Sequence, residues 1–290
     1  MTIRRVLLIL LFVTALGIVP AAAQNTAAPV TVAVGWAPQA QFAGYYAADA
    51  LGYYTAEGLA VTFLDPRPTL DPQAAVIDGQ ADFGIDWLGN VLATRANGGD
   101  VTAIAQVFSD ERGGALAQVT EFVGPNGEFP VYTADDLIVV DGTVQLQSTL
   151  FVRGAWLAEP ASEEIVIRFL RGTFRGWDHC RDNLDECALI MARADAQFGE
   201  ATQRWLVNEV NQLIWPAASG VGVLERSAFN ATADLALGAG IIGAPPDGEG
   251  RAYRSDLAQI ALDSLLFDYD LDVTGRGYSA STVAPPPANS

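Results

Sequence analysis

The sequence predicts an α/β protein built on a mainly parallel sheet. From Thr31 onward, short apolar runs typical of buried strands alternate with helical segments, and glycines follow several of those helices. Repeated β-α-β units of this kind place helices on both faces of a sheet. Half of the 290 residues are hydrophobic, which is ample for a packed core.

The elements are predicted in the following order. Four strands are expected early in the chain, at Val30–Gly35, Leu59–Leu64, Ala81–Ile85 and Val101–Phe108. The helices between them are expected at Phe42–Leu51, Asp71–Asp78 and Trp87–Ala96. A further buried strand is expected at Leu137–Asp141. The remainder is mostly helical, with helices expected at Ser162–Trp177, Glu186–Ala194, Glu200–Leu213, Ser227–Ala239 and Ser255–Phe267. Residues 275–290 are expected to be a disordered tail.

The N-terminus has the pattern of a secretory signal peptide. Arg4 and Arg5 precede the apolar run Val6–Val19, and three alanines follow Pro20. The alternative is an uncleaved membrane anchor, but the run is shorter than the roughly 20 residues that span a bilayer. We therefore predict a signal peptide over residues 1–23 and a periplasmic or otherwise extracytoplasmic protein.

The charge balance bears on the class of partner. The sequence has 16 basic residues, all arginine, and 34 acidic residues, so its formal net charge is −18. A chain this acidic repels phosphate, so its composition argues against nucleic acid and anionic lipid as partners.

The chain contains two cysteines, Cys180 and Cys187. Outside the cytoplasm, a single pair of this kind is most simply a disulfide. Zinc binding is the alternative, but it would need further ligands, and His179 is the only histidine in the sequence. We therefore predict a disulfide, no metal site and no cofactor.

The loop after the first strand is the best candidate for a binding site. It carries Trp36, Gln39 and Gln41, and Trp87 occupies the corresponding place after the third strand. Ligands of open parallel sheets bind beyond the carboxyl ends of strands, where a tryptophan can stack on a planar ring and glutamines can donate and accept hydrogen bonds. The alternative is that the aromatic side chains simply cap the core.

Several sequence pieces resemble the substrate-binding proteins of ABC importers in the NMT1/THI5-like group, whose members handle thiamine pyrimidine precursors, riboflavin and related molecules. The pieces include Trp36-x-Pro38-x-x-Gln41-Phe42-x-Gly44-Tyr45-Tyr46, Gly52-Tyr53-Tyr54-x-x-Glu57-Gly58-Leu59 and Gly79-x-Ala81-Asp82-Phe83-Gly84. Weaker pieces extend the resemblance to Gly240-Ile-Ile-x-Ala-Pro-Pro-Asp.

This resemblance implies a two-lobed fold of the type II periplasmic-binding-protein class and a membrane permease as partner. It implies that Trp36, Gln39, Gln41, Tyr45 and Trp87 line the first lobe's side of the cleft. The pair Gln41-Phe42 resembles the family members that bind riboflavin more than the branch that handles pyrimidine precursors and carries a histidine. Gln39 departs from the asparagine expected there, so the ligand itself stays open.

The second lobe is expected to be truncated. In the family it lies between two crossing strands, but here only residues 109–136 separate the predicted strands, whereas an independent lobe needs at least about 50 residues. The expected organisation is a signal peptide at 1–23, the first part of lobe one at 24–108 and a lobe-two remnant at 109–136. Residues 137–274 complete lobe one, and 275–290 form the tail. A homodimer could supply the missing wall, or the site could be lost.

Two further patterns have structural explanations. Gly238-x-Gly240-x-x-Gly243 matches a dinucleotide fingerprint in spacing, but it follows a helix and precedes two prolines, so helix termination is the better interpretation. Arg168, Arg171 and Arg175 share one helix face, which is interpreted as solvated; an anionic ligand or a permease contact is the alternative.

The function predicted from these observations is capture of a small planar heterocycle for import, without catalysis. Loss of most affinity is expected for Trp36→Ala. A sensor or partner-binding lobe is one alternative. A pyrimidine-synthase-like enzyme is another, although the chain lacks the histidines and cysteine cluster that the family's synthases use. A Gly-x-Ser-x-Gly nucleophile motif is also absent from the sequence.

Overall fold

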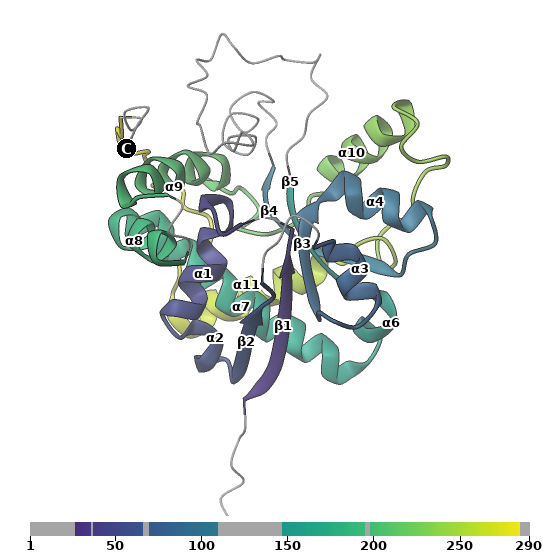
Figure 1. The fold of residues 1–290 in the computed structure, drawn as a ribbon, viewed down its shortest axis with the longest axis horizontal. Coiled ribbons are helices and arrows are strands. Elements are labelled where there is room, and N and C mark those ends of the chain that lie inside the picture. Colours follow the sequence, from purple (N-terminus) through teal and green to yellow (C-terminus); the bar gives the residue numbers. More distant parts are fainter. Residues whose placement is uncertain (1–26, 36, 66–69, 110–146, 195–197, 285–290) are drawn as a thin grey trace, which may run out of the picture.

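A computed structural model describes residues 27–35, 37–65, 70–109, 147–194 and 198–284 (Figure 1). Its sheet has the strand order β2-β1-β3-β5-β4. The strands are β1 (Ala28–Val34), β2 (Leu59–Phe63), β3 (Phe83–Trp87), β4 (Val101–Ser109) and β5 (Gln147–Arg153). The first four lie within two residues of their predicted bounds. The mixed α/β fold expected from the sequence is therefore confirmed.

The strand β5 is antiparallel to both of its neighbours and was not predicted. Leu150 of β5 pairs with Ile85 of β3 on one side and with Ala105 of β4 on the other. The pairs β1–β2 and β1–β3 are parallel. The sequence missed β5 because its apolar run, Leu150–Val152, is short and is flanked by polar residues. The predicted strand Leu137–Asp141 and almost all of the lobe-two remnant lie outside the described residues.

Helices cover both faces of the sheet (Figure 1). Alternate side chains of the strands belong to two separate core clusters, one on each face. The larger cluster is covered by η1 (Ala40–Phe42), α1 (Ala43–Ala50), α2 (Tyr53–Ala56), α7 (Pro160–Asp182), α8 (Leu184–Ala194), α9 (Glu200–Ile214) and α11 (Ser255–Tyr269). The smaller one is covered by α3 (Pro72–Ile77), α4 (Leu88–Ala96) and α10 (Arg226–Gly238). A short helix, α6 (Gly154–Leu157), follows β5.

The helix boundaries follow the local signals in the sequence. Asp71 caps α3, because its side chain accepts a hydrogen bond from the Ala74 backbone N–H at 3.0 Å. Gly240 has a φ of 72° just after α10, so the Gly238–Gly243 glycines end a helix as predicted. Each helix predicted between 42 and 96 and between 162 and 267 corresponds to an observed one. Two helices of four residues, α2 and α6, were missed because they are too short to show periodicity.

The arginines on α7 contact neighbouring elements, so their interpretation as a solvated face is wrong. Arg168 donates to the Glu57 and Gly58 carbonyl oxygens, both at 2.7 Å. Arg171 pairs with the Glu57 carboxylate at 2.9 Å, and the Arg175 guanidinium lies over the Tyr53 ring, 4.2 Å from its centroid. These contacts tie the turn before β2 to α7.

No helix in the described ranges combines the length and the apolar composition that crossing a membrane requires. The predicted signal peptide lies outside those ranges. Of the predicted tail, residues 275–284 are described and 285–290 are not. The predicted domain boundaries remain predictions.

Candidate functional site

The candidate site lies along one edge of the sheet, where β1, β3 and β4 end and β5 begins. β3 and β4 run in the same direction because both are antiparallel to β5. Thr149 of β5 pairs with Asp86 of β3 and with Gln106 of β4, so one row of polar residues crosses three strands. The carboxyl edge of a parallel arrangement is the usual ligand-binding edge of open α/β sheets.

Asp86 organises the junction between β3 and α4. Its carboxylate accepts hydrogen bonds from Gln73 Nε2 at 2.7 Å, from Asn90 Nδ2 at 3.1 Å and from the Trp87 backbone N–H at 2.7 Å. An acidic group is favourable at this position, because a helix N-terminus carries a partial positive charge. These bonds hold the Trp87 backbone at the start of α4.

Trp87 is partly exposed and lines a pocket between α4 and α10. Its relative exposure is 38%, unusually high for tryptophan. The pocket has a volume of about 610 Å³, and its wall includes Asn90 of α4 and the apolar residues Leu235 and Ile241. Its size and composition suit a small, largely apolar molecule.

Gln39 and Gln41 lie on the other side of the edge, around η1. They are only 5% and 7% exposed, and α9 packs against η1. The Gln39 carbonyl accepts from the Phe42 N–H at 2.8 Å and thereby closes η1. No hydrogen bond joins either side-chain amide to another described residue.

Tyr45 lies beneath this edge, in the core. It is fully buried, and its ring packs edge-on against Trp177 with 5.9 Å between ring centroids. Its hydroxyl has no hydrogen-bond partner among the described residues. Burial strongly raises the pKa of Tyr45, and the neighbouring Ser148 hydroxyl only partly offsets this effect.

The structure does not gather the predicted site residues into one described pocket. Gln39, Gln41 and Tyr45 do not line the pocket that contains Trp87. Trp36 lies outside the described residues, so its pairing with Trp87 is not visible. The binding roles of all five residues remain predictions.

Sequence reasoning missed Gln106, Ser148 and Thr149. All three side chains are at least 95% buried, and each has a polar atom without a partner among the described residues. The one available signal was Gln106, a polar residue in a predicted strand whose only other polar residue is Thr102. Ser148 and Thr149 could not have been found, because the strand that carries them was not predicted.

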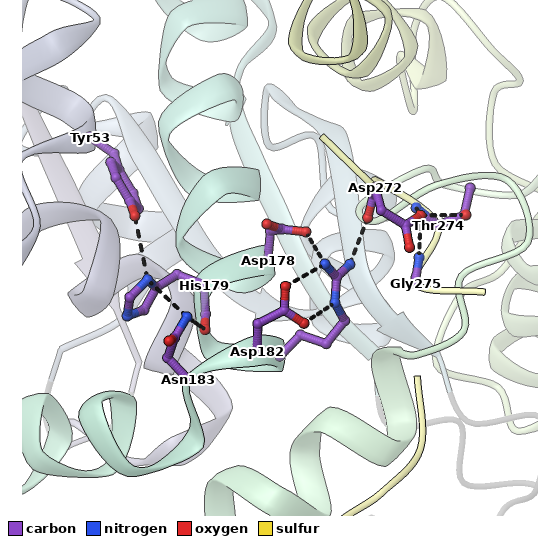
Figure 2. A network of polar contacts seen from close by, with 9 residues as sticks. Tyr53, Asp178, His179, Asp182, Asn183, Asp272, Thr274 and Gly275 are labelled. Carbon is purple, nitrogen blue, oxygen red and sulfur yellow. Dashed lines mark hydrogen bonds and ion pairs between the residues drawn. The ribbon is translucent and has the colours of Figure 1, made fainter. Parts of the chain in front are cut away.

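The lone histidine lies near the end of α7 rather than at this edge (Figure 2). Cys180 follows it on α7, and Cys187 lies on α8. His179 Nδ1 is 3.5 Å from the Tyr53 hydroxyl, and His179 Nε2 is 3.1 Å from the Glu186 carboxylate. The neighbouring Cys180 is bonded to Cys187 in the structure, with 5.2 Å between their Cα atoms, and joins α7 to α8. We propose that this disulfide is present in the folded protein.

The same end of α7 contains a carboxyl group with a perturbed pKa. Burial raises the pKa of Asp178 to about 6, although Arg181, whose Nη2 is 2.6 Å from Asp178 Oδ1, opposes the rise. A carboxyl group with a raised folded-state pKa binds its proton more tightly in the folded chain. Its contribution therefore favours folding at low pH and is lost as the pH rises from about 4 to about 6.

We expect Asp178→Asn to flatten the dependence of stability on pH in this range. When the pH falls from 7 to 5, the free energy of unfolding should rise by about 1 kcal/mol more in the wild type than in the variant. This figure is smaller than the difference in pKa alone would give, because solvent screens the partly exposed carboxylate. Urea denaturation of both proteins at the two pH values measures the difference. Equal gains would contradict the raised pKa of Asp178.

Part of the candidate site matches a known family model. Residues 39–119 match the model described as NMT1/THI5 like. The resemblance predicted from the sequence is confirmed for this part of the chain. The matched segment contains four of the predicted site residues, namely Gln39, Gln41, Tyr45 and Trp87.

A curated relative of this NMT1/THI5-like segment is 4-amino-5-hydroxymethyl-2-methylpyrimidine phosphate synthase THI11 of Saccharomyces cerevisiae. It is 26% identical over 87 residues, which are 30% of this chain and 26% of the yeast protein. The chain therefore spans only about a quarter of this relative's length.

Solved structures with the same architecture cover most of the chain. The periplasmic sulfonate-binding protein SsuA of Methylobacillus flagellatus KT, from a putative sulfonate ABC transporter, has a TM-score of 0.54 at 11% identity. The match covers 89% of this chain and 99% of that one. The periplasmic nitrate-binding protein NrtA of Synechocystis PCC 6803 has a TM-score of 0.55 at 10% identity, covering 82% and 89%. The chain thus has a periplasmic-binding-protein fold.

A third solved structure has the same fold. A point mutant of the protein DSZB, solved in complex with biphenyl-2-sulfinic acid, has a TM-score of 0.53 at 9% identity, covering 82% of this chain and 99% of that one. In the part of this chain that the structure describes, no cluster of three or more His, Cys, Asp or Glu side chains could hold a metal ion.

Proposed function

We propose that this chain is the extracytoplasmic solute-binding protein of an ABC importer and that it captures a small planar heterocycle. The observation that carries the proposal is the partly exposed Trp87, held by Asp86 at the carboxyl edge of the sheet beside an apolar pocket of about 610 Å³. An exposed indole at this edge is suited to stacking on a flat ring. The fold and the NMT1/THI5-like match support the same role.

The polar groups of the edge specify the kind of ligand. Gln39 and Gln41 carry neutral amides, and among the described lining residues of the Trp87 pocket one is charged, the acidic Asp234. A neutral ring system with donors and acceptors on its rim, such as riboflavin or a hydroxymethylpyrimidine, fits this chemistry better than an anion does. The bound molecule would then be passed to a permease in the membrane.

Fluorescence titration of the chain Gln24–Ser290 tests the proposal. Riboflavin and a hydroxymethylpyrimidine are added separately, and quenching of tryptophan emission is followed, with free tryptophan as the control for light absorption by the ligand. Saturable quenching at micromolar concentrations is expected for one of the two. Absence of saturable quenching by both ligands, in a chain with a normal folding transition, would reject this ligand class.

The curated relative's name supports a second candidate, a synthase-like enzyme. His179 is already engaged by Tyr53 and Glu186 at the end of α7, which gives the candidate edge no histidine from the described residues. Product analysis after long incubation with the bound heterocycle separates the two functions. Recovery of unchanged ligand is expected for a binding protein, whereas a new product would favour the enzyme.

A further inference from the structure

A second pocket lies at the end of β4, away from Trp87. It has a volume of about 510 Å³ and is formed by the end of β4, the end of α9, the loop that follows α9 and the start of α10. Its residues include Gln106, Gln212, Trp215, Gly222 and Glu225. It shares no residue with the pocket that contains Trp87.

Gln106 is one of the polar residues that line this pocket. Its side chain is 95% buried, and its Oε1 atom has no hydrogen-bond partner among the described residues. Its Nε2 atom also makes no hydrogen bond within the described ranges. A buried amide without hydrogen-bond partners lowers the stability of the folded state. A bound molecule that completes its hydrogen bonds would remove this loss of stability.

The backbone around Gln106 is firmly held. The Gln106 N–H donates to the Gly222 carbonyl at 2.9 Å, and the Val221 N–H donates to the Val273 carbonyl at 3.0 Å. Gly222 has a φ of 82°, and a Cβ at this position would lie 2.2 Å from the Phe174 ring. The loop is therefore packed tightly against the core, so the Gln106 amide has a fixed position.

The described lining residues favour a neutral molecule over an anion. Among them there is no Arg, Lys or His, and the one charged side chain is that of Glu225, the residue before α10. The Glu225 carboxylate accepts a hydrogen bond from the Ser219 hydroxyl. The described lining thus combines the neutral amide of Gln106 with one negative charge.

We propose that this pocket binds a small neutral molecule with a cis-amide edge, such as a cyclic amide or ureide, through Gln106. A primary amide presents one acceptor and one donor side by side, and an N–H next to a C=O in a ring is its complement. Two parallel hydrogen bonds then satisfy the buried Oε1 and the Nε2 together. The site is separate from the Trp87 pocket and goes beyond the proposed function.

Ligand-observed NMR with three probes tests the proposal on the chain Gln24–Ser290. Hydantoin is neutral and has the cis-amide edge, 1,3-dimethylhydantoin lacks the N–H donors, and hydantoin-5-acetate is an anion. We expect hydantoin to bind at least about tenfold more tightly than either analogue. Equal binding of the dimethyl compound, or no binding of hydantoin at millimolar concentration, would overturn the proposal.

Variants of the two pocket glutamines locate the site. Gln106→Met should weaken hydantoin binding at least about tenfold, while its melting temperature should stay the same or rise, because the substitution removes an unsatisfied buried acceptor. Gln212→Met is the matched control, since the Gln212 amide already donates to the Asn208 carbonyl and to Glu209. Equal losses in the two variants would reject the specific role of Gln106.

The two proposed sites can fail separately. Trp87→Ala should leave hydantoin binding unchanged, because Trp87 is not among the residues that line the Gln106 pocket. Hydantoin could bind more tightly than both analogues and yet lose its binding in Trp87→Ala. In that case hydantoin binds at the Trp87 pocket, and the second site is rejected.

Discussion

Replacing Gly176 by alanine is expected to lower the free energy of unfolding by about 3 kcal/mol, the upper end of the usual cost of overpacking. Gly176 lies on α7 where this helix crosses α1. A Cβ at this position would come 2.0 Å from the Gly44 carbonyl oxygen and 2.9 Å from the Ala48 nitrogen. Because both are backbone atoms, rotation of a side chain cannot relieve the contact, and α1 must move.

Thermal and urea unfolding of Gly176→Ala measure this effect. Gly89→Ala is the matched control, because Gly89 also lies in a helix but has no atom within 4 Å of its would-be Cβ. The control should be as stable as the wild type or more stable by up to about 1 kcal/mol, because alanine is favoured over glycine in a helix. A stable Gly176→Ala variant would show that α1 and α7 do not pack this closely.

Replacing Trp87 by alanine is expected to weaken binding of the heterocycle by about tenfold to a hundredfold, the range found when an aromatic platform for a base is removed. Trp87 is the partly exposed aromatic residue of the α4–α10 pocket, and its backbone is held independently by the Asp86 carboxylate. The substitution should therefore change binding with little effect on folding. Isothermal titration calorimetry measures it, since it does not depend on tryptophan emission.

Phe267→Ala is the matched control for this prediction. Phe267 is an aromatic residue of α11 with 89% relative exposure, and it lines neither pocket described above. Its truncation should leave affinity unchanged. Unchanged affinity in Trp87→Ala as well would remove the stacking hypothesis at this position, and Trp36 would become the residue to test.

The order and bounds of most elements could be predicted from local pattern. Strands such as Leu59–Phe63 and helices such as α9 carry a run or a period in their own residues, together with glycine or capping signals at their ends. α1 and α7 approach closely at Gly44, because a Cβ there would lie 2.3 Å from the Trp177 ring.

The site was only partly predictable. Trp87 and the amides of Gln39 and Gln41 were placed at strand ends by the β-α-β pattern, and the structure puts them at the carboxyl edge. Their exposure was not predictable: Trp87 is open to solvent, while Tyr45, expected beside them, is wholly buried against Trp177. Exposure depends on which helix covers a residue, and covering helices such as α9 and α10 come from more than a hundred residues later in the chain.

The sequence alone determined the α/β class, the strands β1 to β4, the long helices and the resemblance at residues 39–119, because each depends on neighbouring residues. Only the tertiary structure decided that β5 inserts antiparallel between β3 and β4, that the α7 arginines contact Glu57 and Tyr53, and that Gln106 lies unpartnered in a pocket. These features join residues far apart in the chain. Long-range packing creates them, and no local period or composition encodes them.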